Sequence, residues 1–481
     1  MSPVFYVIIR GAMSDKEGML RKLPSVDALL AEPEAESLAG RYGRGQTAAA
    51  VRRVLDALRA SILGNPESAS EEDLEKRAVL AGAGAFLAEK FAPTLRPAVN
   101  ATGILMHSGL GRAVLSEDAV RALGDVARGY STLALEVETG RRGQRDSHVA
   151  SLLRELTGAE AATVVNNNAS ATVLILNTLA KGREVLISRG QLVEIGGSFL
   201  MPEVMALSGA FLREVGTTNK THLRDYAEAI GPATGAILRV HHSNYRILGF
   251  ASEPGVEELA ALGAKHGLPV VDDLGSGALV DLKAYCLATE PLVRASVAAG
   301  VACACFSGDK LIGWPQSGVI VGKAEVIQRV KKNPFARAFR CGKLTLAAME
   351  ATLKLFLAPE KLPERHPVYR MLSLPLGEVG RRAERVAESL GRKLLPPDFE
   401  IAVVDGESQI GSGSVPVETL PTKLLSLRAR GANPDELGKK LRLRKPAVFT
   451  RIHDGAVLFD FRTIQPDEDV LVEAAIFALF P

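Results

Sequence analysis

Seven short apolar runs, rich in valine and isoleucine, dominate the chain from about residue 150 to residue 321. Segments whose apolar residues recur at helical spacing fill most of the gaps between them. Buried runs that alternate with helices are typical of a mainly parallel sheet covered by helices on both faces. We therefore predict an α/β fold with strands at Ala161–Val165, Glu184–Ile187, Phe211–Val215, Ala236–Val240, Pro269–Val271, Val301–Phe306 and Gly318–Val321.

A lysine lies between the last two of these runs, in the sequence Phe306-Ser307-Gly308-Asp309-Lys310. A lysine on a short loop between buried strands is suited to a lowered pKa and to acting as an amine nucleophile. Ser307 is placed to hold a phosphate group with its hydroxyl and nearby N–H groups. A phosphate ligand beside a Schiff-base lysine suggests pyridoxal phosphate (PLP) as cofactor. The same spacing also occurs in serine hydrolases, and Lys310 alone is equally compatible with a solvated hairpin lysine.

Two further strand ends add to this interpretation, because ligands of such sheets bind at the carboxyl ends of strands. Asn168, Ala169 and Ser170 begin a helix after the first run, which is an anion site suited to the cofactor phosphate or simply an ordinary helix cap. Asp273 closely follows the fifth run, where a buried carboxylate needs a partner such as a protonated pyridine nitrogen. We prefer it to Asp272 because a small residue, Gly275, lies two places after it, and we add Ser243, after the fourth run, as a cofactor ligand.

Composition sets few limits on function. The 481 residues carry a formal net charge of +3, which requires neither a nucleic acid nor a membrane partner. No apolar run is long enough to span a bilayer, and the start of the chain lacks the features of a signal peptide. The four cysteines have no zinc or disulfide-scaffold spacing, so we expect no metal and a cytoplasmic protein. Met13 is a second possible start, since a basic, helix-like segment follows it.

The order of these features matches PLP-dependent transferases of type I, the aspartate-aminotransferase-like class. We predict four segments: a helical module at 1–66, a linking helix and active-site arm at 67–150, the PLP-binding large domain at 151–365, and a small C-terminal α+β domain at 366–481. Arginines are concentrated in the helical module, where they form either a phosphate-facing patch or a solvated face.

Long stretches of the chain resemble bacterial L-seryl-tRNA(Sec) selenium transferase, also called selenocysteine synthase. The resemblance runs over nearly the whole length. It is carried by Leu23–Asp27, Asn100–Ala113, Glu138–Gly143, Val164–Ala169, Ser188–Phe199, Val215–Thr221, Asp273–Gly277 and Phe306–Lys310. Family members often have glycine at the position of Trp314, and a bulky indole there would narrow the pocket or shift the Lys310 hairpin.

The resemblance implies an enzyme that converts L-seryl-tRNA(Sec) to L-selenocysteinyl-tRNA(Sec) through an aminoacrylyl-tRNA intermediate. It implies selenophosphate as the selenium donor, a tRNA-binding N-terminal domain and a homo-oligomer, typically a decamer. In this scheme Lys310 carries PLP and removes the Cα proton, while Asp273 keeps the ring nitrogen protonated. Arg112, Arg337 and Arg340 are our candidates for binding selenophosphate, since guanidinium groups suit phosphate. We assign Arg451 and Arg462 to structural ion pairs, because the serine carboxylate is esterified.

Two alternatives remain open at this point. The first is a PLP lyase acting on a small free amino acid or amino-sugar acid, which the Leu23–Asp27 segment disfavours because related lyases lack the tRNA module. The second is a non-catalytic tRNA-binding protein that has kept the fold, which an intact Ser307 and Lys310 disfavour.

Overall fold

The computed structural model describes residues 15–64, 70–195, 199–285, 287, 290–392, 396–414 and 418–480. The alternative start at Met13, the module boundary expected at Pro66, and Cys286 lie outside these residues. The chain divides into two compact units, Met1–Arg96 and Pro97–Pro481.

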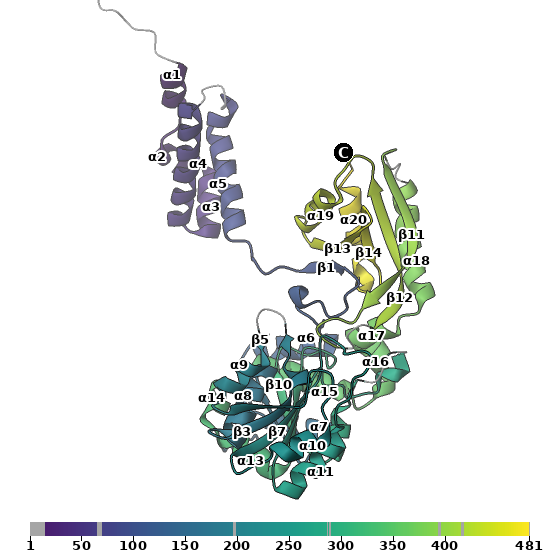
Figure 1. Ribbon diagram of the computed structural model, residues 1–481. Helices are drawn as coiled ribbons and strands as arrows, with labels where there is room; N and C mark the ends of the chain where they lie inside the picture. The colour runs from purple at the N-terminus through teal and green to yellow at the C-terminus, as the bar shows by residue number, and fades with distance from the viewer. Residues whose placement is uncertain are drawn as a thin grey trace, which may run out of the picture. The chain divides into compact units, whose positions relative to one another are not determined.

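The N-terminal unit is a helical bundle (Figure 1). Ser25 caps the second helix, and its side chain accepts a hydrogen bond from the Ala28 N–H. The helices are α1 (Asp15–Lys22), α2 (Val26–Leu30), α3 (Pro33–Tyr42), α4 (Arg44–Gly64) and α5 (Lys76–Lys90). The predicted segment boundary at residue 66 assigns α5 to a linking region that begins at residue 67. The structure instead packs α5 on α4, because its apolar stripe of Val79, Leu80, Ala83 and Leu87 joins the core of the bundle.

The large domain is built on a seven-stranded sheet in the order β2-β10-β9-β8-β7-β3-β6. Strand β10 is antiparallel to both neighbours and the other pairs are parallel, which confirms the predicted mainly parallel sheet. The strands are β2 (Ala161–Val165), β3 (Glu184–Ser188), β6 (Phe211–Val215), β7 (Thr234–Val240), β8 (Val270–Gly275), β9 (Cys303–Ser307) and β10 (Gly318–Gly322). A separate two-stranded sheet joins β4 (Glu194–Ile195) and β5 (Phe199–Leu200).

Helices cover both faces of this sheet, and each face has its own apolar core. One face is covered by α7 (Ser147–Thr157), α10 (Leu223–Ala229), α11 (Val256–His266), α12 (Val293–Ala298) and α15 (Lys343–Leu355). The other is covered by α8 (Asn168–Ala180), α9 (Met201–Leu207) and α13 (Ala324–Lys332). Outside these layers α6 (Glu117–Ala127) packs on α15, and the remaining short helices are α14 (Pro334–Ala338), α16 (Leu362–Arg365) and α17 (Pro367–Ser373).

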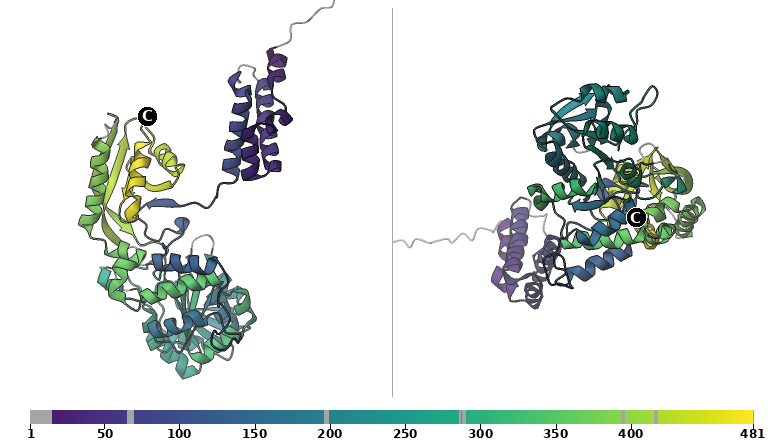
Figure 2. Two further views of the ribbon diagram at one scale, coloured as in Figure 1. Left: turned by 180° about the vertical axis from the view of Figure 1, so that it is seen from behind. Right: turned by 90° about the horizontal axis from the view of Figure 1, so that it is seen from below.

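The small domain has a five-stranded sheet in the order β1-β13-β14-β12-β11. Its strands are β1 (Ala98–Ala101), β11 (Phe399–Gln409), β12 (Thr419–Ala429), β13 (Ala447–His453) and β14 (Ala456–Asp460). The helices α18 (Leu376–Arg392) and α20 (Asp469–Phe477) pack on each other, and α19 (Pro434–Arg442) packs on β13. Figure 2 shows this domain, coloured green to yellow, from two further sides. This architecture agrees with the α+β domain predicted for residues 366–481, except that β1, from far earlier in the chain, also joins its sheet.

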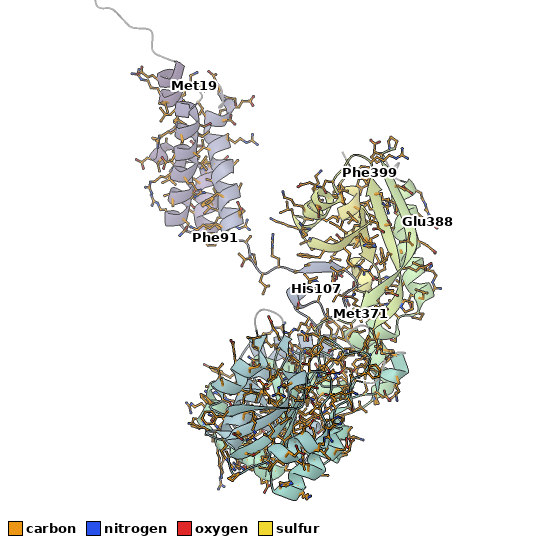
Figure 3. The ribbon with its side chains drawn as sticks, in the orientation of Figure 1. Met19, Phe91, His107, Met371, Glu388 and Phe399 are labelled. Carbon is orange, nitrogen blue, oxygen red and sulfur yellow. The ribbon has the colours of Figure 1, made fainter. Side chains whose placement is uncertain are left out.

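After β1 the chain turns into a glycine-rich segment that leads to the large domain. Its backbone is held by the end of β11: Leu105 N–H donates to Gln409 O, and Met106 N–H donates to Ile410 O, both at 2.9 Å. Figure 3 labels His107 on this segment and Met371 on α17. No described helix is both long and apolar enough to cross a membrane.

Candidate active site

Lys310 lies in the loop between β9 and β10, where Ser307, the last residue of β9, pairs with Gly318. Its side chain is buried, with 5% of the residue exposed. Burial lowers the pKa of Lys310, and the positive charge of Arg112 lowers it further, while three nearby carboxylates act in the opposite direction. Among the described residues, no hydrogen bond or ion pair holds the amine. The site therefore contains a buried amine that is available as a nucleophile or base.

Asp273 lies near the end of β8 and is almost completely buried. Its carboxylate accepts hydrogen bonds from Asn168 Nδ2 at 2.7 Å, from Thr172 Oγ1 at 2.9 Å and from the Gly275 N–H at 3.2 Å. Burial raises the pKa of Asp273, whereas these hydrogen bonds and the charge of Lys310 lower it. A positive charge beside this carboxylate, such as a protonated pyridine nitrogen, would favour its ionised form.

Asp272 faces away from this site, because neighbouring residues of a strand point to opposite faces. Its carboxylate forms an ion pair with Arg239 at 2.9 Å and accepts a hydrogen bond from Ser296 Oγ at 2.6 Å. Both acceptor oxygens are therefore occupied by structural partners, which agrees with the preference for Asp273.

The predicted phosphate turn lies beside Asp273 at the start of α8. Asn167 caps this helix, and its side chain accepts a hydrogen bond from the Ser170 N–H at 2.8 Å. The N–H of Ser170 is thus already used, whereas the N–H groups of Asn168 and Ala169 have no hydrogen-bond partner among the described residues. Ser307 is also nearly buried, with 8% of the residue exposed. The turn keeps an anion-binding geometry with fewer free donors than the sequence suggested.

Within the part of the chain that the structure describes, four buried polar atoms around Lys310 and Asp273 have no hydrogen-bond partner. Such atoms are costly to bury unless a ligand or water satisfies them. They are Asn168 Oδ1, His241 Nδ1, Ser243 Oγ and Asp309 Oδ1. Together with the amine and the Asp273 carboxylate, they fit a polar, aromatic cofactor that carries a phosphate, as PLP does.

Arg112 is the one predicted anion ligand that the structure brings to Lys310. Its guanidinium forms an ion pair with Asp309 Oδ2 at 2.7 Å. Its backbone has φ 64°, a left-handed conformation that is uncommon for a residue other than glycine and is often found at functional sites. The ion pair therefore holds a cation directly next to the loop that carries Lys310.

Arg337 and Arg340 have no described contact to Lys310, Asp273 or Arg112, although the backbone of Arg340 pairs with Val165, just before the predicted phosphate turn. They line a cavity of about 440 Å³ at the β2 edge of the sheet, together with Arg142 and Arg145. The positive charge of Arg145 lowers the pKa of Arg340, and so do the charges of Arg337 and Arg142. Four arginines that repel one another form a strong candidate anion site, but within one chain it is separate from Lys310.

The two C-terminal arginines are structural, as expected, but only one of them through an ion pair. Arg451 pairs with the buried carboxylate of Asp460 at 3.3 Å. Arg462 donates instead to the carbonyl oxygens of Met371, Leu374 and Pro421. The ion-pair assignment was therefore wrong for Arg462. Its guanidinium donates to carbonyl groups at the end of α17 and in β12.

Several residues of the site were not singled out from the sequence. Thr172 follows Asn168 by one helical turn, so its place on the same helix face was the available signal. Asp309 precedes Lys310 directly, and His241 follows β7. Glu290 interacts electrostatically with Lys310 and accepts a hydrogen bond from Ser276 Oγ at 3.0 Å, but its sequence surroundings carry no recognisable signal.

Comparison with known proteins gives matches over most of the chain. Residues 98–465 match the family described as L-seryl-tRNA selenium transferase, and residues 20–59 match the selenocysteine synthase N terminal family. The L-seryl-tRNA(Sec) selenium transferase of Desulfomicrobium baculatum is 46% identical over 461 residues, which is 96% of this chain and 99% of that protein. The corresponding protein of Alkaliphilus metalliredigens is 44% identical over 463 residues, again 96% of this chain and 99% of that protein.

Among solved structures, that of a D-glucosaminate-6-phosphate ammonia-lyase matches with a TM-score of 0.56 and 18% identity, covering 82% of this chain and 97% of the other. This likeness shows that the two proteins share a fold. From the length and identity of the sequence matches, the chain belongs to the L-seryl-tRNA(Sec) selenium transferase family.

Proposed function

We propose that Lys310 and Asp273 carry the chemistry of a PLP-dependent selenium transferase that converts L-seryl-tRNA(Sec) to L-selenocysteinyl-tRNA(Sec). One arrangement supports this most. At the carboxyl ends of β2, β8 and β9 lie a helix-start anion site, a buried carboxylate and a buried amine that has no partner among the described residues. Family membership over the whole length supplies the reaction and the cofactor.

The residues that would hold PLP are Lys310 at its aldehyde, Asp273 at its ring nitrogen, and Asn168, Ala169, Ser170 and Ser307 at its phosphate. Ser243 is a further ligand, because its buried hydroxyl lacks a partner. Bound PLP withdraws electrons from the α-carbon of an attached amino acid, which permits loss of the seryl hydroxyl and addition of selenium at the β-carbon.

Each residue then has a defined task. Lys310 Nζ, whose pKa is lowered by burial, takes the proton from the seryl α-carbon. Asp273 keeps a proton on the ring nitrogen, and its hydrogen bonds to Asn168 and Thr172 fix its orientation. Arg112 attracts the anionic selenium donor to the same edge of the sheet, and Asp309 orients the Arg112 guanidinium.

We further propose selenophosphate as the selenium donor, with Arg337 and Arg340 as additional ligands for its phosphate. The cavity of four arginines supports this role by its charge. Because this cavity is separate from Lys310 within one chain, we also propose a homo-oligomer, with a decamer as its expected size. Light scattering on the purified protein tests the oligomer.

The N-terminal bundle is the proposed tRNA-binding module, and the cytoplasm is the proposed location, as the substrate requires. The segment matching the selenocysteine synthase N terminal family supports the first assignment, and so do the exposed arginines of α4. Deleting residues 1–96, the whole N-terminal unit, is expected to weaken tRNA binding while PLP binding remains, which a filter-binding assay and cofactor absorbance measure separately.

The decisive experiment compares wild type with Lys310→Ala in the conversion of charged tRNA with selenophosphate. We expect wild type to show visible absorbance from lysine-bound PLP that borohydride removes, and Lys310→Ala to lack both this absorbance and activity. Equal activity of the two proteins would refute the assignment.

A further inference from the structure

The backbone that carries Lys310 forms a tight turn that is buried almost throughout. The Gly308 N–H donates to Ser317 O at 2.9 Å, and the Trp314 N–H donates back to Gly308 O at 3.2 Å. Within the turn, the Gly313 N–H donates to Lys310 O at 3.0 Å. The lysine thus stands on a closed loop whose two ends are fastened together.

Trp314, the single tryptophan of the chain, braces this loop from inside the core. Only 1% of the residue is exposed, and its indole Nε1–H donates to Ser317 Oγ at 2.6 Å. A Cβ atom added at Gly308 would lie 1.4 Å from Nε1, so the indole edge lies directly against the Gly308 backbone. The indole therefore packs under the loop, within the apolar core of the large domain.

His366, just before α17, holds the other side of the loop. Its Nε2 lies 2.8 Å from Ile312 O, and because a carbonyl only accepts, Nε2 carries the hydrogen. Burial lowers the pKa of His366 to about 4, so the ring is neutral at physiological pH. A Cβ added at Gly313, whose φ is +73°, would lie 2.2 Å from the ring carbon Cε1. The ring therefore fits against the loop only because this position is glycine.

The ring of His366 is itself fixed. Phe356 and Tyr369 pack edge-on against it, with ring centroids 5.6 Å and 5.0 Å away. The end of α17 is tied to the small domain, since Arg462 Nη1–H groups donate to the carbonyl oxygens of Met371 and Leu374. His366 thus connects the Lys310 loop to a rigid aromatic cluster and, through α17, to the small domain.

We propose that Trp314 and His366 are positioning residues for Lys310: they immobilise the loop backbone so that the amine moves only by rotation of its own side chain. This rests on the proposed role of Lys310. The amine has to reach both the cofactor and the substrate α-carbon. Misplacing a catalytic group by about 1 Å can lower the rate about a hundredfold. A fixed backbone limits the amine to a small set of rotamers that reach both.

The test uses substitutions that remove single hydrogen bonds of the loop. Trp314→Phe and Ser317→Ala remove the same bond from opposite sides, and Ser317→Ala is small enough to leave the fold intact. His366→Leu removes the donor to Ile312 O, whereas His366→Gln keeps an N–H donor at a similar reach. Phe459→Leu, in the fully buried core of the small domain, is the control for a general loss of stability.

We expect Trp314→Phe, Ser317→Ala and His366→Leu to lower kcat by about tenfold or more, with KM for seryl-tRNA changed less than about twofold. The pH midpoint of the PLP absorbance should move in these three variants, and His366→Gln should restore much of both values. Without cofactor, the emission of Trp314 in the Ser317→Ala apoprotein should shift to longer wavelength as the loop loosens.

The proposal is overturned if the three loop variants keep the kcat and absorbance midpoint of the Phe459→Leu control and Ser317→Ala also keeps the tryptophan emission of that control. That result leaves the proposed function intact as long as Lys310→Ala abolishes absorbance and activity. If Lys310→Ala retains them, the proposed function fails first, whatever the loop variants do.

Discussion

Gly318 offers a sharp test of how the cofactor site is built, because it faces the turn at the start of α8. A Cβ atom added there would lie 2.2 Å from Asn167 O, 2.5 Å from Asn167 C and 2.9 Å from Asn168 N. These are all backbone atoms, so no flexible side chain is able to move aside. Gly318 itself is held by pairing with Val165 on one side and Ser307 on the other.

We therefore predict that Gly318→Ala displaces the Asn167–Asn168 turn by about 1 Å, the distance needed to restore an ordinary contact of 3.4 Å. Overpacking of this kind typically costs about 1–3 kcal/mol. If about 2 kcal/mol of this cost destabilises the PLP-bound protein relative to the apoprotein, the affinity for PLP drops about thirtyfold. The Asn168 Nδ2 bond to Asp273 should be lost with it.

The assay is a titration of the apoprotein with PLP, followed by visible absorbance and by Trp314 emission. Gly124→Ala, in the middle of α6 with no atom within 4 Å of the added Cβ, is the matched control. It should keep PLP affinity and gain up to about 1 kcal/mol of stability from helix propensity. Wild-type PLP affinity in Gly318→Ala would refute the view that this turn forms the phosphate end of the site.

Three further predictions concern the charged groups. Asp273→Asn should abolish transferase activity with little loss of folding stability. Asp272→Asn should lower the unfolding free energy by about 3–5 kcal/mol, because it breaks a buried pair with Arg239. Denaturant unfolding measures the stability of both variants, and an activity assay measures their transferase rates. An active Asp273→Asn protein together with a stable, inactive Asp272→Asn protein would contradict the assignment. Capture of PLP by the apoprotein needs the neutral Lys310 amine, so its rate should fall as pH is lowered through the pKa of that amine. Arg112→Gln removes a charge that lowers this pKa, so the fall should begin at higher pH, and a shift to lower pH would be inconsistent with the site. Arg340→Gln should raise KM for selenophosphate and leave KM for seryl-tRNA unchanged, measured by initial rates; an unchanged selenophosphate KM would exclude that arginine as a ligand.

The sheet and the cofactor site illustrate what sequence is able to predict. Apolar runs identified every strand of the large sheet, because most of these strands are covered on both faces and have a nearly unbroken apolar pattern; the edge strand β6 is largely exposed. The choice between Asp272 and Asp273 followed from one glycine, and the contacts of both carboxylates agree with it.

Other features have no local signal. The pairing of β1 with β13, the extent of the N-terminal unit to Arg96, and the carbonyl partners of Arg462 depend on which distant segments meet. Helix α5 was assigned to the wrong segment because its apolar stripe does not reveal which core it joins. The lack of contact between these two arginines, Arg337 and Arg340, and Lys310 was also invisible, since the sequence does not show that the strand before them, β10, begins beside the Lys310 loop and ends away from it.

The pairing of β1 with β13 has a consequence for synthesis on the ribosome. Ala98–Ala101 emerge early, but their hydrogen-bonding neighbour, Ala447–Thr450, emerges only near the end of translation. Closing so long a loop is slow, and the hydrogen-bonding groups of β1 stay unpaired until β13 has been synthesised. The segment that carries Arg112 also forms its backbone hydrogen bonds to Gln409 and Ile410 only after most of the chain has been synthesised. A nascent or prematurely terminated chain thus lacks the anchored Arg112 segment of the proposed active site even when its large domain has already folded.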